Sequence, residues 1–386
     1  MKTIYLDTPA TSHFKPRCVR RAFLKYLSLS ANPGRGGHSL AVKNATMIWQ
    51  TREILAKQFG NIEPEDVIFT KNATEALNIA ILGLCKKNKG KHVICSCFEH
   101  NSVLRPLHYL ESLGEITLTV VNPQNKKFIT ASDISSAIKK NTFLVCLTAI
   151  SNVTGNRNNF EDVGALCNKK SILFLLDDAQ GVGHIKVDMK KSHINFLAFS
   201  GHKGLHTPQG IGVLCINSKT YPAPIIFGGT GTESENLFQP TVPPECYESG
   251  TVASPLIASL SAGARYIEKH FDIHARKVAK LTQYMISKLR EIEGVRIYSN
   301  LENTYGVVAF SVAGFDSIEV TDFLSEKYHI ASRGGLHCAP LAHKFLGTME
   351  SGLTRVGVDF KNSYHDINVL ARAVAELSTM SQLKKQ

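Results

Sequence analysis

Three positions in the sequence could together do chemistry, and each follows a short apolar run. Lys203 stands in the segment SGHKG, and lysine is the side chain that forms Schiff bases. Asp177 ends an apolar run, where a buried carboxylate needs a cation or hydrogen-bond donors. Asn72 and Glu75 have capping-box spacing, so a helix begins there and its free N–H groups suit a phosphate near Thr74.

Taken singly, each position also has a purely structural explanation. Asn72 and Glu75 fit a well-capped helix. Asp177 fits a structural salt bridge, and Lys203 fits a solvated turn. Taken in order along one parallel sheet, they supply a phosphate cradle, a carboxylate partner for a protonated pyridine nitrogen and an imine-forming lysine. These are the three needs of pyridoxal phosphate.

The elements that must position these residues alternate between strand and helix patterns. Apolar runs of near-continuous hydrophobicity suit strands that are buried on both faces of a mainly parallel sheet. Ligands of such sheets gather at the carboxyl ends of the strands, where the three positions lie. The expected strands are seven, at residues 66–70, 92–95, 116–121, 143–149, 172–177, 195–200 and 210–216.

The flanking segments complete the predicted architecture, an α/β fold with a second, smaller α+β domain. We expect a helix over 38–59 and an irregular loop over 218–253. Helices near 256–272 and 274–292, strands around 295–312, and helices at 316–328 and 364–380 should follow. The predicted large domain spans 15–255, and the predicted small domain combines 1–14 with 256–386.

Charge and cysteine content exclude several classes of protein. Lys plus Arg outnumber Asp plus Glu by 44 to 32, but the positive residues form no stripe with aromatics, so we expect no nucleic-acid partner. The nine cysteines are an odd number without framework spacing, which argues against a disulfide scaffold and a zinc site. Their number favours a reducing compartment, and no segment resembles a signal or a membrane span. We therefore expect a cytoplasmic protein without membrane contact or a metal.

Ten motifs, spread nearly end to end, give the chain a resemblance to a known family. It resembles the class V, fold-type I pyridoxal-phosphate enzymes of the cysteine desulfurase/selenocysteine lyase family. The motifs are YLDTPAT at 5–11, NPGRGGH at 32–38, NATEALN at 72–78, EH at 99–100, SNVTG at 151–155, DDAQ at 177–180, SGHKG at 200–204, ESGT at 248–251, RGGLHCAP at 333–340 and TRV at 354–356.

The resemblance implies a role for each matching residue. Lys203 would carry the cofactor and move the Cα proton, Asp177 would pair with the pyridine nitrogen, Gln180 would contact the ring oxygen, and His100 would stack on the ring as acid or base. Further cofactor-binding residues would be Ala73, Thr74, Asn152, Ser200, His202 and, from a second subunit of a homodimer, Thr251. The substrate would be held by Arg355, Asn152, Arg333 and His38, with Arg355 clamping the α-carboxylate.

Cys338 decides which reaction the resemblance implies. RGGLHCAP matches the short-loop pattern R-x-G-x-H-C, and the resemblance implies that the Cys338 thiolate attacks the sulfur of L-cysteine and that alanine is released. L-Selenocysteine would be a second substrate. A persulfide on Cys338 would then pass to an acceptor protein. Neighbouring cations such as His337 or Arg333 would favour the thiolate by lowering the pKa of Cys338. The other eight cysteines are expected to be structural.

The sequence departs from the family pattern near the substrate and leaves alternatives open. Thr8 and Pro9 replace an Asn and a small residue, Ala73 stands where many relatives carry a hydroxyl or Gly, and Arg355 lies 17 residues after Cys338. One alternative is another class V enzyme, such as an aminotransferase, with Cys338 incidental. Another is a non-catalytic binding scaffold. Iron–sulfur assembly, tRNA thiolation, molybdenum cofactor sulfuration and selenium supply are all open as destinations of the sulfur.

Overall fold

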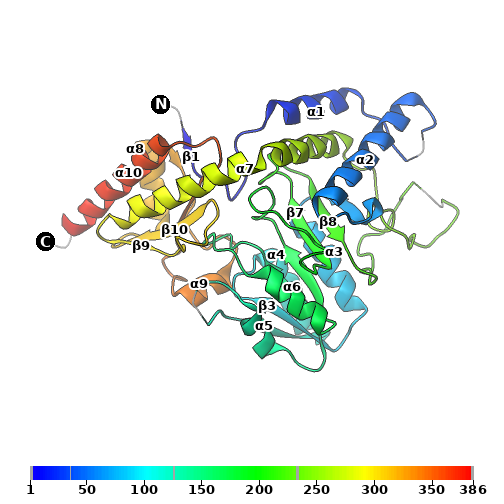
Figure 1. The fold of residues 1–386 in the computed structure, drawn as a ribbon, viewed down its shortest axis with the longest axis horizontal. Helices are drawn as coiled ribbons and strands as arrows, with labels where there is room; N and C mark the ends of the chain where they lie inside the picture. Colours follow the sequence, from blue (N-terminus) through cyan, green and yellow to red (C-terminus); the bar gives the residue numbers. More distant parts are fainter. Residues whose placement is uncertain (1–2, 35, 125–126, 232–233, 384–386) are drawn as a thin grey trace.

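A seven-stranded sheet forms the centre of the computed structural model (Figure 1), which describes residues 3–34, 36–124, 127–231 and 234–383. The strand order is β2-β8-β7-β6-β5-β3-β4. Strands β3 to β7 run parallel, and β8 runs antiparallel to both of its neighbours, β2 and β7. The strands are β2 (Val67–Thr70), β3 (Lys91–Ser96), β4 (Ile116–Val121), β5 (Thr142–Thr148), β6 (Leu173–Asp177), β7 (Phe196–Ser200) and β8 (Gly212–Ile216).

All seven predicted strands are confirmed, each within two residues of its expected ends. The mainly parallel character of the sheet is confirmed too. Strand β8 is the exception because only the short turn after Ser200 connects it to β7, whereas parallel neighbours need a longer crossover.

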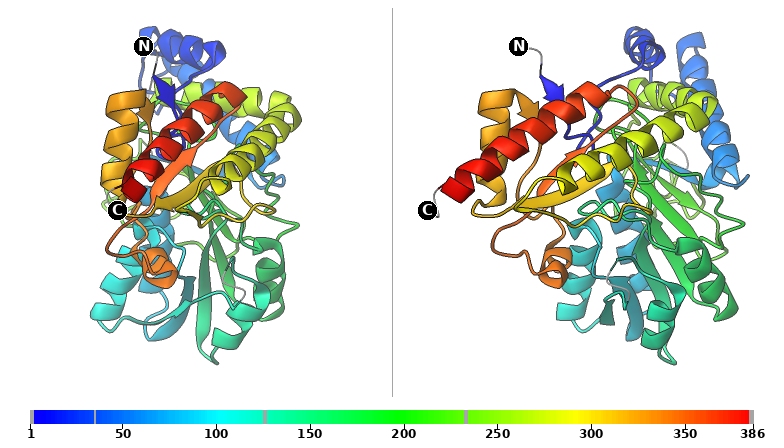
Figure 2. Two further views of the ribbon diagram at one scale, coloured as in Figure 1. Left: turned by 90° about the vertical axis from the view of Figure 1, so that its left-hand side faces the viewer. Right: turned by 60° about the vertical axis from the view of Figure 1, so that its left-hand side comes forward.

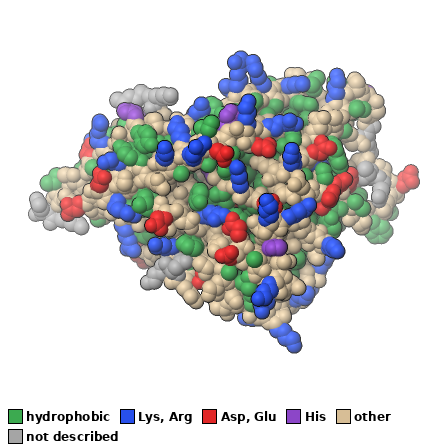
Figure 3. Space-filling model, in the orientation of Figure 1, with side chains coloured by type: hydrophobic (Ala, Val, Ile, Leu, Met, Phe, Trp, Pro, Cys, Tyr) green, Lys and Arg blue, Asp and Glu red, His purple; other side chains and the backbone are tan. Residues whose placement is uncertain are grey.

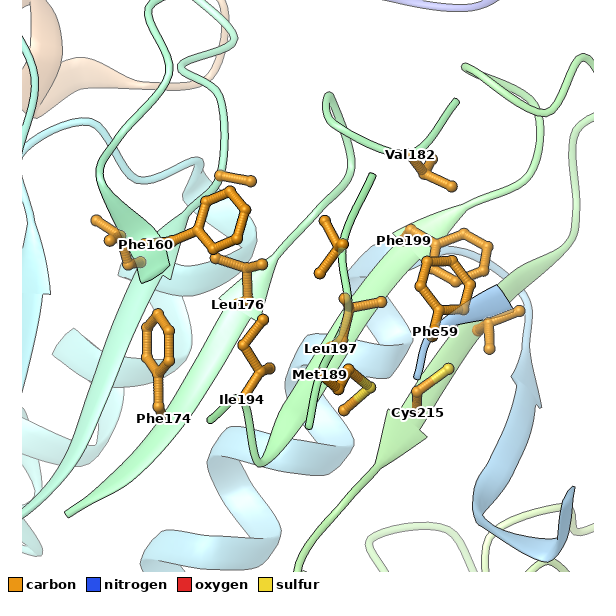
Figure 4. Close-up of a cluster of buried hydrophobic side chains, with 14 of the residues drawn as sticks. Phe59, Phe160, Phe174, Leu176, Val182, Met189, Ile194, Leu197, Phe199 and Cys215 are labelled. Carbon is orange, nitrogen blue, oxygen red and sulfur yellow. The ribbon is translucent and has the colours of Figure 1, made fainter. Parts of the chain in front are cut away.

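Helices cover both faces of this sheet. Leu77 of α3 and Val103 of α4 belong to a buried cluster on one face, with strand residues such as Leu175. Phe174 and Leu176, which alternate with Leu175, point to the other face and join a second cluster (Figure 4). The helices of this part are α1 (Arg17–Ser28), α2 (Ser39–Gln58), the 3-10 turn η1 (Pro64–Asp66), α3 (Ala73–Lys86), α4 (Asn101–Ser112), α5 (Ala131–Ala137), α6 (Phe160–Lys169) and α7 (Ser254–Arg290).

A second group of strands has a buried cluster of its own. Strands β12, β10 and β9 form an antiparallel sheet, and β1 pairs in parallel with β11. Leu6, Phe310 and Leu370 are fully buried here. Figure 2 shows α10, in red, beside the yellow half of α7. The elements are β1 (Ile4–Tyr5), β9 (Val295–Ile297), β10 (Val307–Val312), α8 (Ser317–Tyr328), β11 (Ile330–Ala331), α9 (Pro340–Leu346), β12 (Thr354–Gly357) and α10 (Tyr364–Leu383).

The prediction of two helices between 256 and 292 is wrong, because α7 is one continuous helix of 37 residues. Its first half buries residues up to Ile267 against the large sheet, and its second half buries Val278 and its successors in the other cluster. No residue between these two is buried, so the apolar stripe is interrupted. The backbone continues since the interval contains neither Gly nor Pro.

The division into domains at residue 255 stays a prediction, and α7 runs across it. The segment 218–253 has no helix or strand among its described residues, as expected. Within the described ranges, no helix is long and apolar enough to cross a membrane.

Charged side chains of both signs are interspersed over the face shown in Figure 3. The clearest group of one sign lies along the upper edge, where α1 carries exposed Arg17, Arg20, Arg21 and Lys25.

Candidate active site

A cavity of about 480 Å³ opens at the carboxyl ends of the parallel strands. It brings together twelve of the fourteen predicted site residues, although they are spread over some 280 positions of the chain. They are Ala73, Thr74, His100, Asn152, Asp177, Gln180, Ser200, His202, Lys203, Arg333, Cys338 and Arg355.

The N-terminus of α3 forms one end of the cavity. Helix α3 begins at Ala73 as predicted, because the Asn72 side chain accepts the Glu75 N–H at 3.0 Å. The Glu75 carboxylate reaches the N–H of Lys71 rather than that of Asn72, so the expected box is displaced by one residue. The Ala73 N–H donates to Ser200 Oγ at 2.8 Å. A hydroxyl and a helix N-terminus therefore meet here, as a phosphate site requires.

Asp177 ends strand β6 and is buried beside the cavity. Its Oδ1 accepts the Ala179 N–H at 2.9 Å. Burial raises the pKa of Asp177, while the Ala179 N–H and the charge of Lys203 act in the opposite direction. A buried carboxylate whose pKa is subject to these opposing effects is suited to form an ion pair with a cation in the cavity.

The neighbouring Asp178 is fully buried and does not line the cavity. Neither of its carboxyl oxygens has a hydrogen-bond partner in the described part of the chain. Burial, and then the charge of Asp177, raise the pKa of Asp178 well above its usual range. Burial and the charge of Asp177 thus both favour the protonated form of Asp178.

Lys203 follows β7 and projects into the cavity from the turn after Ser200. Burial lowers the pKa of Lys203 to about 8, against the opposing charge of Asp177. A lysine with this pKa has a substantial neutral fraction near pH 8, and the neutral amine is the nucleophilic form.

His100 is the N-cap of helix α4, and its ring is held in one protonation state. Its Nδ1 accepts the Ser102 N–H at 3.0 Å and lies 2.8 Å from Ser102 Oγ. Burial, followed by the charge of Lys203, lowers the pKa of His100 to about 4. The ring is neutral near pH 7, with its hydrogen on Nε2, because Nδ1 accepts the backbone N–H.

Pro9, Ala10 and Thr11, which belong to the motif at 5–11, line one part of the cavity. Gln180 Nε2 donates to the Pro9 carbonyl at 2.8 Å, and His202 Nδ1 lies 3.0 Å from Thr11 Oγ1. The His202 carbonyl accepts both the N–H and the hydroxyl of Ser12, at 3.0 and 2.7 Å. The N-terminal segment thus fixes the turn that carries the lysine.

Two arginines that line the cavity share one carboxylate, that of Asp7. Arg355 is buried and donates to Asp7 Oδ1 at 3.2 Å and to the Asn152 carbonyl at 2.9 Å. Arg333 donates to Asp7 Oδ2 from Nη2 at 3.1 Å and from Nε at 3.3 Å. Arg355 Nε has no partner among the described residues, so a buried donor is left for a carboxylate. Asp7 is a site residue that the sequence argument missed.

Cys338 is exposed and lines the cavity next to these arginines. The expectation that His337 acts as a cation beside it is wrong. His337 is buried, its Nε2 lies 2.9 Å from the Leu353 carbonyl, and burial lowers its pKa to about 2. A neutral imidazole brings no positive charge, which leaves Arg333 as the predicted cation.

Two predicted residues lie outside the cavity of their own chain. His38 is exposed and caps α2 by accepting the Ala41 N–H at 3.4 Å, so its contact with substrate stays a prediction. Thr251 lines a separate cavity of about 550 Å³, together with Gly34 and Trp49. Among the described residues, no group of three or more His, Cys, Asp or Glu side chains could hold a metal ion.

Comparison with known proteins places this geometry in context. The Aminotransferase class-V family profile matches residues 4–370. "Probable cysteine desulfurase" of Pyrococcus abyssi is 34% identical, with 97% of this chain and 94% of the relative covered. The protein of the same name from Methanothermobacter thermautotrophicus is 31% identical, with 98% and 95% covered.

Solved structures agree with the sequence comparisons. The apo structure of cysteine desulfurase from Thermococcus onnurineus has a TM-score of 0.91 at 33% identity, with 98% of this chain and 95% of that chain covered. The cysteine desulfurase CsdA of Escherichia coli, in an S-sulfonic acid form, has a TM-score of 0.86 at 25% identity, with 97% and 94% covered. These likenesses confirm the predicted family and fold class.

Proposed function

Because this chain belongs to the aminotransferase class V family, we propose that it is a pyridoxal-phosphate-dependent cysteine desulfurase. It would convert L-cysteine to L-alanine and leave the sulfur as a persulfide on Cys338. One observation carries the proposal: the cavity that contains Lys203 and Asp177 also contains an exposed thiol, that of Cys338.

The residues of the cavity fit pyridoxal phosphate. Asp177 offers the buried carboxylate that a protonated ring nitrogen needs, and Lys203 offers the amine. Thr74 lies in the first turn of α3, and Ser200 and His202 line the same cavity. The phosphate would bind at this N-terminus of α3. When bound, the cofactor supplies an electron sink that stabilises negative charge at Cα of the substrate.

Arg355 would hold the substrate by its α-carboxylate. Its unpartnered Nε and its remaining N–H groups form a fork that suits two carboxylate oxygens. Asp7 keeps the guanidinium charged and oriented, since burial lowers the pKa of Arg355 to about 10 while Asp7 opposes that shift. Asn152 holds the same guanidinium through its backbone carbonyl.

Lys203 Nζ would take the proton from Cα, because its neutral form is accessible near pH 8. His100 is neutral and would present its Nε2–H to the bound ring or substrate. The Cys338 Sγ would attack the substrate sulfur as a thiolate, forming an S–S bond while the substrate C–S bond breaks. L-Cysteine and the Cys338 thiol then give L-alanine and a Cys338 persulfide, and no external oxidant is needed.

Sulfide release from L-cysteine in the presence of a thiol reductant tests this proposal. Cys338→Ala should lose at least about 100-fold in rate, because the nucleophile is gone. Cys18→Ala is the matched control, since Cys18 is the other exposed cysteine and does not line the cavity. Undiminished desulfuration by Cys338→Ala would contradict the persulfide route.

Two alternatives have their own signatures. An aminotransferase with an incidental Cys338 would transfer the amino group to an α-keto acid at the same rate in wild type and Cys338→Ala. A non-catalytic scaffold would show no visible cofactor band that borohydride bleaches and that Lys203→Ala abolishes.

A homodimer is part of the proposal. Thr251 would bind the phosphate of a second subunit; its exposure and its position outside its own chain's cavity support this. The adjoining loop exposes Phe227, Leu237 and Phe238, at 63%, 98% and 83%, which is a large apolar surface for a lone chain. L-Selenocysteine as a second substrate, an acceptor protein and a cytoplasmic location are the remaining parts of the proposal.

A further inference from the structure

The backbone at Cys338 has an unusual conformation. His337 and Cys338 have φ values of +49° and +57°, so two consecutive residues with side chains are left-handed. Each such residue costs about 1–3 kcal/mol unless its surroundings impose the conformation. The turn is closed by its own bond, from the Ala339 N–H to the Leu336 carbonyl at 2.9 Å, and bonds from elsewhere in the protein add to it.

Two hydrogen bonds hold the two carbonyls of this turn. Asn152 Nδ2 donates to the His337 carbonyl at 2.6 Å. The backbone N–H of Asn101 donates to the Cys338 carbonyl at 2.7 Å. Asn101 is the first residue of α4, so its N–H is one of those that a helix cannot use internally.

Both donors are also tied to the groups that would bind cofactor and substrate. The Asn152 carbonyl accepts from Arg355 Nη1, so one residue joins the proposed carboxylate clamp to the Cys338 turn. Helix α4, which supplies the Asn101 N–H, is capped by His100. Hydrogen bonds thus connect the turn that carries the Cys338 thiol to residues near both the proposed cofactor and the proposed substrate.

We propose that the Asn152 side-chain amide and the Asn101 N–H are positioning donors that hold the left-handed turn and aim Cys338 Sγ at the substrate sulfur. This inference rests on the proposed desulfurase function. It gives Asn152 a role toward the nucleophile in addition to its predicted contact with cofactor and substrate. Without the two bonds, the turn relaxes and the thiol leaves its attacking position.

Asn101 allows a test of its backbone N–H. Asn101→Pro replaces the donor with a ring CH2 that cannot bond to the Cys338 carbonyl, whereas Asn101→Ala keeps the N–H and controls for loss of the side chain. Proline is well tolerated at the first position of a helix. The preceding residue, His100, already has a ψ of 155°, which suits the residue before a proline.

Two rates are measured on each variant. The first is persulfide formation on Cys338 in a single turnover of the cofactor-loaded protein with L-cysteine. The second is alkylation of Cys338 by iodoacetamide in the cofactor-free protein, with exposed Cys18 as internal reference. Misplacement by about 1 Å can cost an intramolecular step roughly 100-fold, whereas a bimolecular reagent needs no such alignment.

We expect Asn101→Pro to form persulfide at least roughly ten-fold more slowly than Asn101→Ala. The alkylation ratio of Cys338 to Cys18 should stay equal or rise, because the thiol is freed rather than buried. Equal persulfide rates in the two variants would overturn the inference. So would a parallel fall of both rates, since that indicates a thiol that has become inaccessible.

Asn152→Ala gives a second route in case the proline variant does not fold. Its control is Asn44→Ala, which removes a buried amide that donates to the carbonyls of Leu29 and Leu40, away from the cavity. The same split between the two rates is expected for Asn152→Ala and not for Asn44→Ala. A loaded wild-type protein that forms no persulfide on Cys338 would instead refute the desulfurase function, and this inference with it.

Discussion

At the scale of single residues, burial decides the charge of the groups around the cavity. Lys203 illustrates this, because burial lowers the pKa of its amine from 10.5 to about 8. The neutral fraction of that amine should rise about ten-fold per pH unit up to about pH 8 and then level off. We predict that pyridoxal phosphate adds to the cofactor-free protein with this pH dependence.

Stopped-flow measurement of the visible cofactor band between pH 6 and 10 would check this prediction. A lysine of ordinary pKa would give a rate that keeps rising to about pH 10. Such an unbroken rise would show that the cavity does not lower the pKa of Lys203.

Asp178 gives a second prediction, about stability. Its pKa is raised well above the value of 3.8 that an unburied carboxyl has, so the folded protein keeps a proton that the unfolded chain releases above about pH 4. This linkage destabilises the fold increasingly as the pH rises. Asp178→Asn lacks the titrating group, so its stability advantage over wild type should grow from pH 5 to pH 8.

Urea unfolding of wild type and Asp178→Asn at several pH values would measure that difference. Asp177→Asn is the informative contrast, because Asp177 lines the cavity and its loss should weaken retention of the cofactor. A difference in stability that shrinks toward pH 8 would mean that Asp178 is not protonated in the folded protein.

At the scale of elements, α7 joins two buried clusters that the sequence suggests are separate. Ile273 lies in the interval without buried residues and is 65% exposed, so its side chain contributes little packing. A proline there removes a helix hydrogen bond and clashes with the preceding turn. We predict that Ile273→Pro costs about 3 kcal/mol of the free energy of unfolding.

Ile273→Ala is the control and should cost less than about 0.5 kcal/mol, as is usual for surface substitutions. Denaturant midpoints of the two variants would decide the matter. If the proline variant is as stable as the alanine variant, the helix is interrupted at this position in solution.

At the scale of the whole molecule, the proposed dimer makes each active site a joint product of two chains. We predict that co-expressed Lys203→Ala and Thr251→Ala chains regain desulfuration. In a mixed dimer, one site lacks both residues and the other has Lys203 from one chain and Thr251 from its partner.

The rate of the purified mixed dimer, compared with those of the two parent dimers, would test this arrangement. Absence of recovery, in a mixed dimer that sedimentation shows to be intact, would place Thr251 outside the partner's site.

The parts of the molecule that the sequence predicts well are those that local patterns encode. Apolar runs specify the seven strands, and Asn72 marks the start of α3 because capping involves residues three apart. The cavity residues on strand ends follow from sheet topology. That topology accounts for Thr74, Asp177 and Lys203, and the family resemblance implied the other predicted residues that line the cavity.

The parts that it misses depend on contacts between distant segments. Asp7 lies 326 and 348 positions from the arginines that it binds, so the motif at 5–11 that contains it does not reveal these contacts. The neutral state of His337 follows from burial in the folded protein, which a motif does not reveal. The sequence pattern divides α7 into two helices because the two halves of α7 bury their apolar faces in different clusters.

The contacts of Asp7 and of residues 9–12 with distant segments have a consequence for synthesis of the protein. These residues are synthesised before their partners His202, Arg333 and Arg355, which follow up to 348 positions later. At about 5–20 residues per second, Arg355 is made roughly 20–70 s after Asp7. Asp7 therefore stays without this partner until Arg355 has been made, and the pocket is complete only then.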